Sequence, residues 1–181
     1  MIKYYIFDMD GTLCHSMGFW RAETAHIPNY RDPAAMQIAY DNMRHRYRDE
    51  IGLRAGARKL LKNARAAGIR CCIASATARD VAQPFLDKTG LMDYMDFYID
   101  CHEIGIFKEH PDIYLQSAQR FGAEISECAV FEDSEYCART AKKAGFYVVG
   151  VYDPTTSAEG DTAAYSDMYI NSLEDFKGIK E

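Results

Sequence analysis

Two aspartates near the start of the chain are the first candidates for chemistry. Asp8 and Asp10 come directly after four large apolar residues, 4–7, and Gly11 follows them. Residues two apart in a strand point to the same side, so both carboxylates are expected to face one way, and glycine lets the backbone turn sharply. Carboxylates about 4 Å apart repel each other by about 4 kcal/mol in a protein-like dielectric, so the pair requires a cation.

Three later positions carry side chains that suit the same site. Ser75 ends a second apolar run, and Thr77 lies just behind it. Lys108 precedes a helical pattern, and Glu132 and Asp133 close another apolar run. Carboxylate oxygens suit a hard cation such as Mg²⁺, which binds together with substrate phosphate and water, while a lysine and a hydroxyl donate to a phosphoryl group. These residue types predict a magnesium and phosphoryl site.

Strand-like and helical patterns alternate along the chain and would bring these residues together. Continuously apolar runs, typical of parallel strands covered on both faces, occupy residues 4–7, 69–74, 97–99, 128–131 and 147–151. Helical patterns lie between them, and one that begins near Pro84 is expected to end at Gly90. We therefore predict an α/β fold with a doubly wound, Rossmann-like parallel sheet, whose strand ends share one edge.

One segment interrupts this alternation. Residues 14–52 contain no strand pattern, only two helical stretches, the second of which is expected to start at Pro33. We predict a small all-helical cap over residues 14–52, inserted into a core formed by residues 1–13 and 53–181. Within the cap, Tyr30 and Arg31 are candidates for binding the non-reacting end of a substrate. A stripe at helical spacing is expected to form the cap core: Met36, Tyr40, Met43 and Tyr47.

Composition limits the function classes. The chain has 181 residues and a net charge of −6, which argues against a nucleic-acid partner because phosphate binding needs a basic stripe. Its six cysteines include no C-x-x-C pair, which favours free thiols in a reducing cytoplasm over disulfides or zinc. No apolar run reaches membrane-spanning length and no signal peptide is evident, so we expect a cytoplasmic monomer with no membrane partner.

The residues named above resemble, in their order, a known family. FDMDGTL, Ser75, Lys108 and Glu132-Asp133 look like the four motifs of the haloacid dehalogenase-like (HAD) phosphohydrolases. The cap position resembles the subgroup of phosphoglycolate phosphatase and β-phosphoglucomutase, whose cap lies between the first two motifs. The resemblance implies a small phosphorylated metabolite as substrate and Mg²⁺ as cofactor.

The resemblance also implies a role for each motif residue. Asp8 would be the nucleophile that forms an aspartyl-phosphate, and Asp10 would be the general acid and then the general base. Ser75 would hold phosphoryl oxygens with Thr77 beside it, and Lys108 would neutralise Asp8 and the phosphate. The metal site would consist of the Asp8 carboxylate, the Asp10 carbonyl and Asp133, with Glu132 supporting it.

Other functions are weighed against this one. Halide-removing relatives lack the second aspartate, so Asp10 argues against dehalogenation. A sugar phosphomutase of the β-phosphoglucomutase type uses a cap histidine and a cap lysine, but Trp20 stands at the histidine's place and the cap contains no lysine. A phospho-acceptor or metabolite-binding module without turnover is an alternative of another class, although receiver-type modules have no insertion after such a turn.

Overall fold

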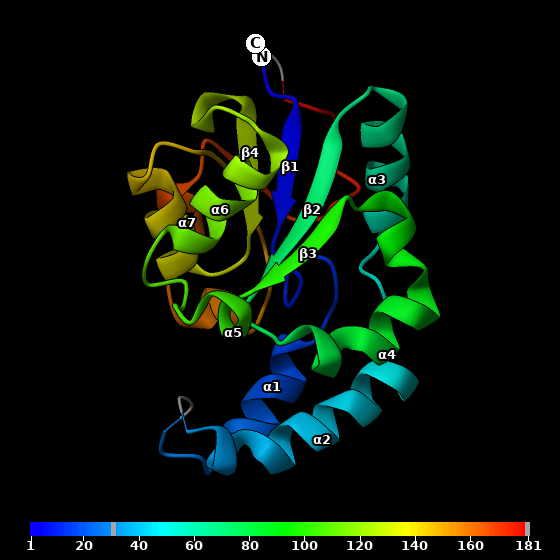
Figure 1. The fold of residues 1–181 in the computed structure, drawn as a ribbon, viewed down its shortest axis with the longest axis vertical. Helices are drawn as coiled ribbons and strands as arrows, with labels where there is room; N and C mark the ends of the chain where they lie inside the picture. The colour runs from blue at the N-terminus through cyan, green and yellow to red at the C-terminus, as the bar shows by residue number, and fades with distance from the viewer. Residues whose placement is uncertain (30–31, 180–181) are drawn as a thin grey trace.

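Six parallel strands form one sheet in the computed structural model, which describes residues 1–29 and 32–179 (Figure 1). Their order in the sheet is β3-β2-β1-β4-β5-β6, and every neighbouring pair is parallel. The strands are β1 Tyr4–Phe7, β2 Arg70–Ser75, β3 Phe97–Asp100, β4 Cys128–Glu132, β5 Tyr147–Val151 and β6 Met168–Ile170. The predicted α/β fold with a doubly wound parallel sheet is confirmed.

The strand order places the functional edge at the centre of the sheet. β1 lies between β2 and β4, and Phe7 is in register with Ile73 on one side and Phe131 on the other. The chain proceeds outward from β1 to β3 and then returns to β4, so the order reverses beside β1. Open α/β sheets bind ligands outside the carboxyl ends of the strands at such a reversal. Asp8 and Glu132 therefore lie at that point.

Helices cover both faces of the sheet and its carboxyl edge. The α-helices are α1 Met17–Thr24, α2 Pro33–Asp49, α3 Ala57–Ala66, α4 Arg79–Thr89, α5 Cys101–Ile104, α6 Asp112–Phe121 and α7 Glu135–Lys143. Short 3₁₀ turns are η1 Leu91–Tyr94, η2 Ile125–Glu127, η3 Thr156–Ala158 and η4 Thr162–Tyr165. No helix in this described part of the chain has the length and apolar character needed to cross a bilayer.

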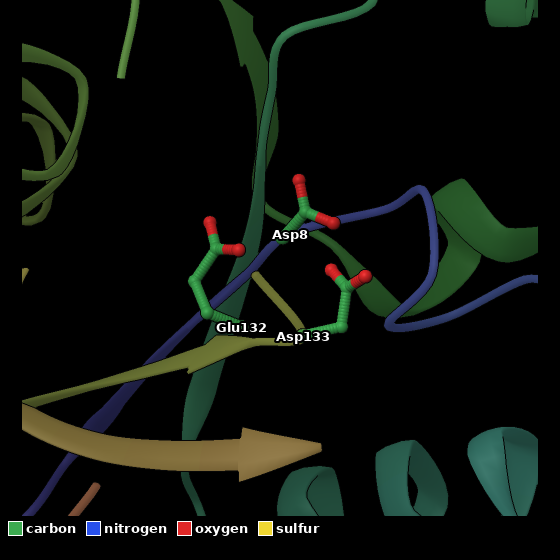
Figure 2. A group of neighbouring side chains, drawn as sticks. All are labelled: Asp8, Glu132 and Asp133. Atoms are coloured by element: carbon green, nitrogen blue, oxygen red, sulfur yellow. The ribbon is translucent and has the colours of Figure 1, made fainter. Parts of the chain in front are cut away.

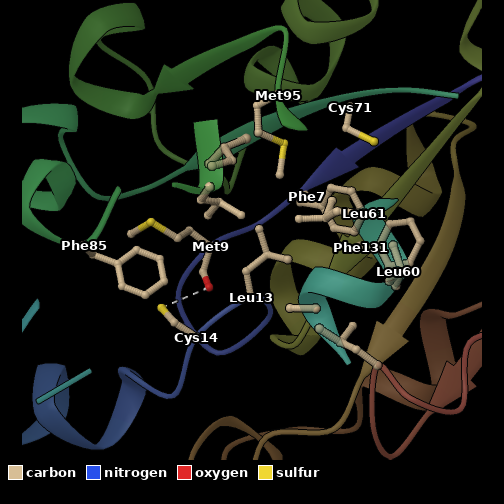
Figure 3. Close-up of a cluster of buried hydrophobic side chains, with 14 of the residues drawn as sticks. Phe7, Met9, Leu13, Cys14, Leu60, Leu61, Cys71, Phe85, Met95 and Phe131 are labelled. Atoms are coloured by element: carbon tan, nitrogen blue, oxygen red, sulfur yellow. Dashed lines mark hydrogen bonds between the residues drawn. The ribbon is translucent and has the colours of Figure 1, made fainter. Parts of the chain in front are cut away.

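Alternation along the strands divides the core into two layers. Phe7 and Phe131 face α3 and α4, where Leu61 and Phe85 complete a close-packed cluster (Figure 3). Their strand neighbours Ile6 and Val130 point to the opposite face and pack under α6 and α7. Both faces are buried, which explains why β1 to β5 are mainly apolar, with charged residues only at strand ends.

Helices α1 and α2 cross the carboxyl ends of the strands (Figure 1). The Asp32 carboxylate accepts the Ala34 N–H at 3.0 Å and caps α2, with Pro33 at its first turn. The expected stripe divides: Met43 and Tyr47 are fully buried in the main core, whereas Met36 belongs to a small cluster with Ile27 and Ala39.

Helix α4 begins earlier than the sequence suggested. It starts at Arg79 rather than near Pro84, which lies inside it, and it ends at Gly90 as expected, in the left-handed conformation. The Asp100 carboxylate accepts the Arg79 N–H at 3.0 Å and satisfies the helix start. Asp100 is the last residue of β3, so the sequence around Arg79 does not reveal this contact.

Candidate active site

Three carboxylates converge where β1 and β4 end. Asp8 follows β1, and Glu132 and Asp133 lie at the end of β4; Figure 2 shows their side chains directed toward one another. One oxygen from each lies within 4.8 Å of the others, and all three residues are buried. The Asp8 N–H donates to the Phe131 carbonyl at 2.9 Å, which fixes the end of β1 against β4. The sheet itself therefore assembles the predicted acidic cluster.

Lys108 brings a buried positive charge to this cluster. Its ammonium donates to Asp8 Oδ1 at 2.5 Å and to Glu132 Oε1 at 2.7 Å, and the Tyr114 hydroxyl also donates to Glu132 Oε1 at 2.7 Å. Burial disfavours the charged lysine, but attraction from Asp8 and Glu132 outweighs it and raises the Lys108 pKa well above its ordinary value. The side chain is thus held as an ammonium beside Asp8.

One cation is insufficient for three buried carboxylates. Asp8 Oδ2 and Asp133 Oδ2 are buried and have no hydrogen-bond partner among the described residues. Burial raises the pKa of Asp8 well above its ordinary value against the opposing pull of Lys108, and burial together with repulsion from Asp8 raises that of Asp133. Unpartnered carboxylate oxygens of this kind fit a hard divalent cation such as Mg²⁺.

The turn after β1 requires glycine. Gly11 has φ +87°, and a Cβ at this position would lie 2.1 Å from Asp133 Oδ2. The Gly11 N–H donates to the Cys14 carbonyl at 2.9 Å, and the Thr12 hydroxyl donates to Asp133 Oδ1 at 3.3 Å. The turn therefore brings the backbone close to the β4 carboxylate while leaving Asp133 Oδ2 without a donor.

Asp10 is held by neutral donors from both the cap and the core. Ser16 donates to its Oδ1 at 2.5 Å and Thr77 to its Oδ2 at 2.7 Å. The hydroxyl of Tyr47, a fully buried residue of α2, also donates to Asp10 Oδ1, and the indole N–H of Trp20 donates to that hydroxyl at 3.0 Å. Asp10 thus links the acidic turn to both cap helices.

Ser75 and Thr77 occupy different positions in the site. Ser75 is fully buried, and its Oγ accepts the Thr77 N–H at 3.0 Å. Thr77 and Ala76 line the cavity above the carboxylates. In the loop after β2, Ala76 and Thr77 are therefore available to a ligand. Ser75 holds this loop through its hydrogen bond with the Thr77 N–H.

A cavity of about 350 Å³ opens over these residues. Its acidic side consists of Asp8, Asp10, Glu132 and Asp133, with Lys108 among them. Its other side is mainly apolar and includes Met17, Trp20, Met36, Tyr40, His102 and Phe107. The volume lies within the range of about 300–1,000 Å³ that is typical of small-molecule sites.

Sequence reasoning did not identify every residue at this site. Tyr30 and Arg31, proposed there as substrate-binding residues, lie outside the described residues. Nothing in the sequence indicated that Ser16 and Tyr47 would contact Asp10. The helical spacing of Tyr47 predicted only that its side chain would be buried. His102 and Phe107 follow β3 without a recognisable pattern, and only the fold brings them to the cavity.

Known proteins share sequence and fold with this chain. A sequence model of haloacid dehalogenase-like hydrolases matches residues 39–145, more than half of the chain. Protein CbbY of Rhodobacter capsulatus is 31% identical over 129 residues, which cover 68% of this chain and 55% of that protein. A protein of Drosophila melanogaster named probable pseudouridine-5'-phosphatase is 32% identical over 131 residues, covering 69% and 56%.

The chain belongs to the haloacid dehalogenase-like hydrolases. The crystal structure of CbbY from Rhodobacter sphaeroides in complex with phosphate has the same fold, with a TM-score of 0.83 at 19% identity over 99% of this chain and 98% of that one. This haloacid dehalogenase-like chain spans about half the length of the curated relatives named above. The family match includes Ser75, Lys108, Glu132 and Asp133, while Asp8 and Asp10 precede it.

Proposed function

We propose that this haloacid dehalogenase-like hydrolase is a Mg²⁺-dependent phosphatase that hydrolyses a small phosphorylated metabolite through an aspartyl-phosphate. The observation that supports it most directly is the buried Lys108–Asp8 ion pair beside the unpartnered oxygens of Asp8 and Asp133. Phosphoryl transfer depends mainly on positioning and on neutralising charge, and this arrangement provides both. Relatives named as phosphatases support the same reaction.

In the proposed reaction, a carboxylate oxygen of Asp8 attacks phosphorus, and the bond from phosphorus to the ester oxygen breaks. Asp10 gives a proton to the departing alkoxide and then takes one from the water that attacks the aspartyl-phosphate, so inorganic phosphate leaves and Asp8 is regenerated. Lys108 stays beside Asp8 as an ammonium, and Thr77 holds Asp10 toward the cavity. Asp8, Asp133 and the Asp10 carbonyl would hold Mg²⁺, supported by Glu132, and the ion supplies charge neutralisation for the phosphoryl group.

We further propose the domain division 14–52 for the cap and 1–13 with 53–181 for the core. A bridge between Cys14 and Leu53 and a hydrogen bond of 2.9 Å from the Arg54 N–H to the Leu13 carbonyl support it, because they join the two ends of the insertion. The unpaired, buried thiols support a reducing, cytoplasmic location. A monomer is supported by the scatter of exposed large apolar side chains over several elements.

Phosphate release from a panel of phosphorylated metabolites with Mg²⁺ tests the proposed function. We expect hydrolysis of at least one compound, and its loss on adding EDTA or in Asp8→Asn, while Asp87→Asn on the exposed surface of α4 keeps the activity. Phosphate migration within a sugar, without release, would instead identify a mutase. A stable phospho-aspartate without turnover would identify a phospho-acceptor module.

A further inference from the structure

Four aromatic rings form a continuous wall on the apolar side of the cavity. They are Trp20 of α1, Tyr40 of α2, His102 of α5 and Phe107, and we call them the aromatic wall. Consecutive ring centroids lie 6.2, 6.0 and 5.7 Å apart, and the ring planes meet at 80°, 82° and 74°. Edge-to-face contacts of this kind are a favourable geometry for aromatic pairs. The wall therefore joins the cap helices to the segment after β3.

The ring surfaces of the wall are only partly covered by protein. Trp20 and Tyr40 contact the small cap cluster of Ile27, Met36 and Ala39, of which Met36 also lines the cavity. Trp20, Tyr40 and Phe107 are nevertheless only partly buried, and His102 is exposed. A core stack would be closed by close packing on every side. The remaining ring surface belongs to the same cavity as Asp8 and Lys108.

The charges around the cavity restrict what can lie against this wall. Among the described residues that line it, Lys108 is the sole lysine or arginine, and its ammonium is shared between Asp8 and Glu132. The other charged lining residues are carboxylates, among which Glu159 is paired with Arg21. A second phosphate or a carboxylate on the substrate would meet repulsion from these acids and no unpaired lysine or arginine among the described lining residues.

We propose that the substrate is a monophosphate ester of an uncharged alcohol that carries a planar aromatic ring, as in a nucleoside 5′-monophosphate. Its phosphate lies at Asp8 and Lys108, and its ring packs against the aromatic wall. This substrate class rests on the proposed phosphatase function. The wall provides ring surface, and the acidic lining selects against a second negative group.

Uridine 5′-monophosphate and ribose 5-phosphate test the proposal, because they share the phosphate and the sugar and differ in the ring. Base stacking on aromatic side chains is substantial, so we expect kcat/KM to be at least about tenfold higher for the nucleotide. Tyr40→Ala is expected to reduce the ratio of kcat/KM for the nucleotide to kcat/KM for ribose 5-phosphate by about tenfold. Tyr40→Phe keeps the ring and should keep the preference, and Tyr152→Ala, an exposed tyrosine outside the cavity, serves as the matched control.

A binding measurement gives a readout without turnover. Trp20 is the single tryptophan of the chain, so its emission reports on the wall alone. In Asp8→Asn, we expect uridine 5′-monophosphate to quench this emission and ribose 5-phosphate to leave it unchanged. Equal kcat/KM for the two esters, an equal loss for both in Tyr40→Ala, or no quenching by the nucleotide would overturn the proposal.

A generic substrate separates failure of this proposal from failure of the proposed function. Acetyl phosphate has no ring and needs little protonation of its leaving group. If it is hydrolysed in an Asp8-dependent manner while uridine 5′-monophosphate is not, the phosphatase assignment stands and the ring preference is wrong. If neither these compounds nor any ester of the metabolite panel releases phosphate, the phosphatase assignment itself is contradicted.

Discussion

Asp10 is held differently from the other acids of the site. Asp8 and Glu132 contact the Lys108 ammonium, whereas Asp10 accepts from neutral donors, the hydroxyls of Ser16, Tyr47 and Thr77 and the Cys14 thiol. Tyr47 is the donor that comes from the cap helix α2 and is itself fixed by Trp20. A general acid must be placed within hydrogen-bonding reach of the leaving oxygen, so Tyr47 is a candidate positioning residue.

Removing the Tyr47 hydroxyl should affect substrates according to their leaving group. Because an alkoxide needs a proton and p-nitrophenolate does not, we expect Tyr47→Phe to lower kcat/KM for an alkyl phosphate by about 10–100-fold and that for p-nitrophenyl phosphate by less than about threefold. Steady-state kinetics with both esters would measure this. Tyr5→Phe, a buried tyrosine of β1, is the control, and an equal loss for both esters in Tyr47→Phe would indicate a structural role only.

The acids proposed for catalysis could be brought together from the sequence because strand ends converge. Asp8, Glu132 and Asp133 each end or follow an apolar run, and a parallel sheet must bring such ends to one edge, whereas Lys108 lies between α5 and α6. The contact from Tyr47 to Asp10 could not be predicted, because it depends on how the cap packs over that edge. Helical spacing predicts which face of α2 is buried and not which residue meets the acid.

The loops at the carboxyl edge are joined by one buried arginine. The Arg54 guanidinium donates to the carbonyls of Gly11 and Tyr152 and lies 3.4 Å from an oxygen of Asp153. It therefore connects the turn after β1, the end of the cap insertion and the loop after β5. Asp153 is itself buried and accepts the Thr155 N–H at 2.8 Å. Its negative charge is balanced by the Arg54 guanidinium.

Arg54→Met should destabilise the protein strongly. The substitution leaves a buried carboxylate without its cation and two carbonyls without a donor, so we expect a loss of about 3–5 kcal/mol in the free energy of unfolding. Urea denaturation followed by circular dichroism would measure it. Arg65→Met, which removes an exposed arginine of α3, should change stability by no more than about 0.5 kcal/mol. Similar midpoints for the two variants would show that the three loops do not depend on Arg54.

Strands β1 to β5 were predicted, and β6 was not. The five runs were identified because they are apolar at nearly every position. β6 is a three-residue edge strand, Met168–Ile170, in which Tyr169 is exposed, and its short apolar run was not predicted as a strand. The start of α4 was misplaced because its first N–H is satisfied by Asp100 of β3, a tertiary contact that local propensity does not include.

For the molecule as a whole, the acidic cluster is a source of instability without a cation. Three buried carboxylates share one buried lysine, and the burial of Asp133 raises its pKa, which shows that its charged form is disfavoured. A ligand that binds only the folded state adds stability in proportion to the logarithm of its concentration over Kd. The proposed Mg²⁺ site should therefore be visible in thermal unfolding as well as in activity.

Mg²⁺ should raise the melting temperature through Asp133. At about 100 times Kd, we expect an increase on the order of 5–10 °C relative to EDTA. Asp133→Asn should melt higher than the unsubstituted protein in EDTA, because repulsion is relieved, and should show no increase with Mg²⁺. Differential scanning calorimetry provides the comparison, and Asp87→Asn should retain the full increase. An undiminished Mg²⁺ effect in Asp133→Asn would contradict the proposed ligand set.

The six cysteines have a practical consequence. All are buried, and burial raises the pKa of Cys71 and Cys128 to about 12 and that of Cys101 to about 11. Because the thiolate is the reactive form, none presents a nucleophile to a maleimide in the folded protein. A cysteine introduced at Ile38, which is 69% exposed on α2, would be the one position to accept a fluorophore. Movement of the cap could then be followed by spectroscopy in the otherwise native sequence.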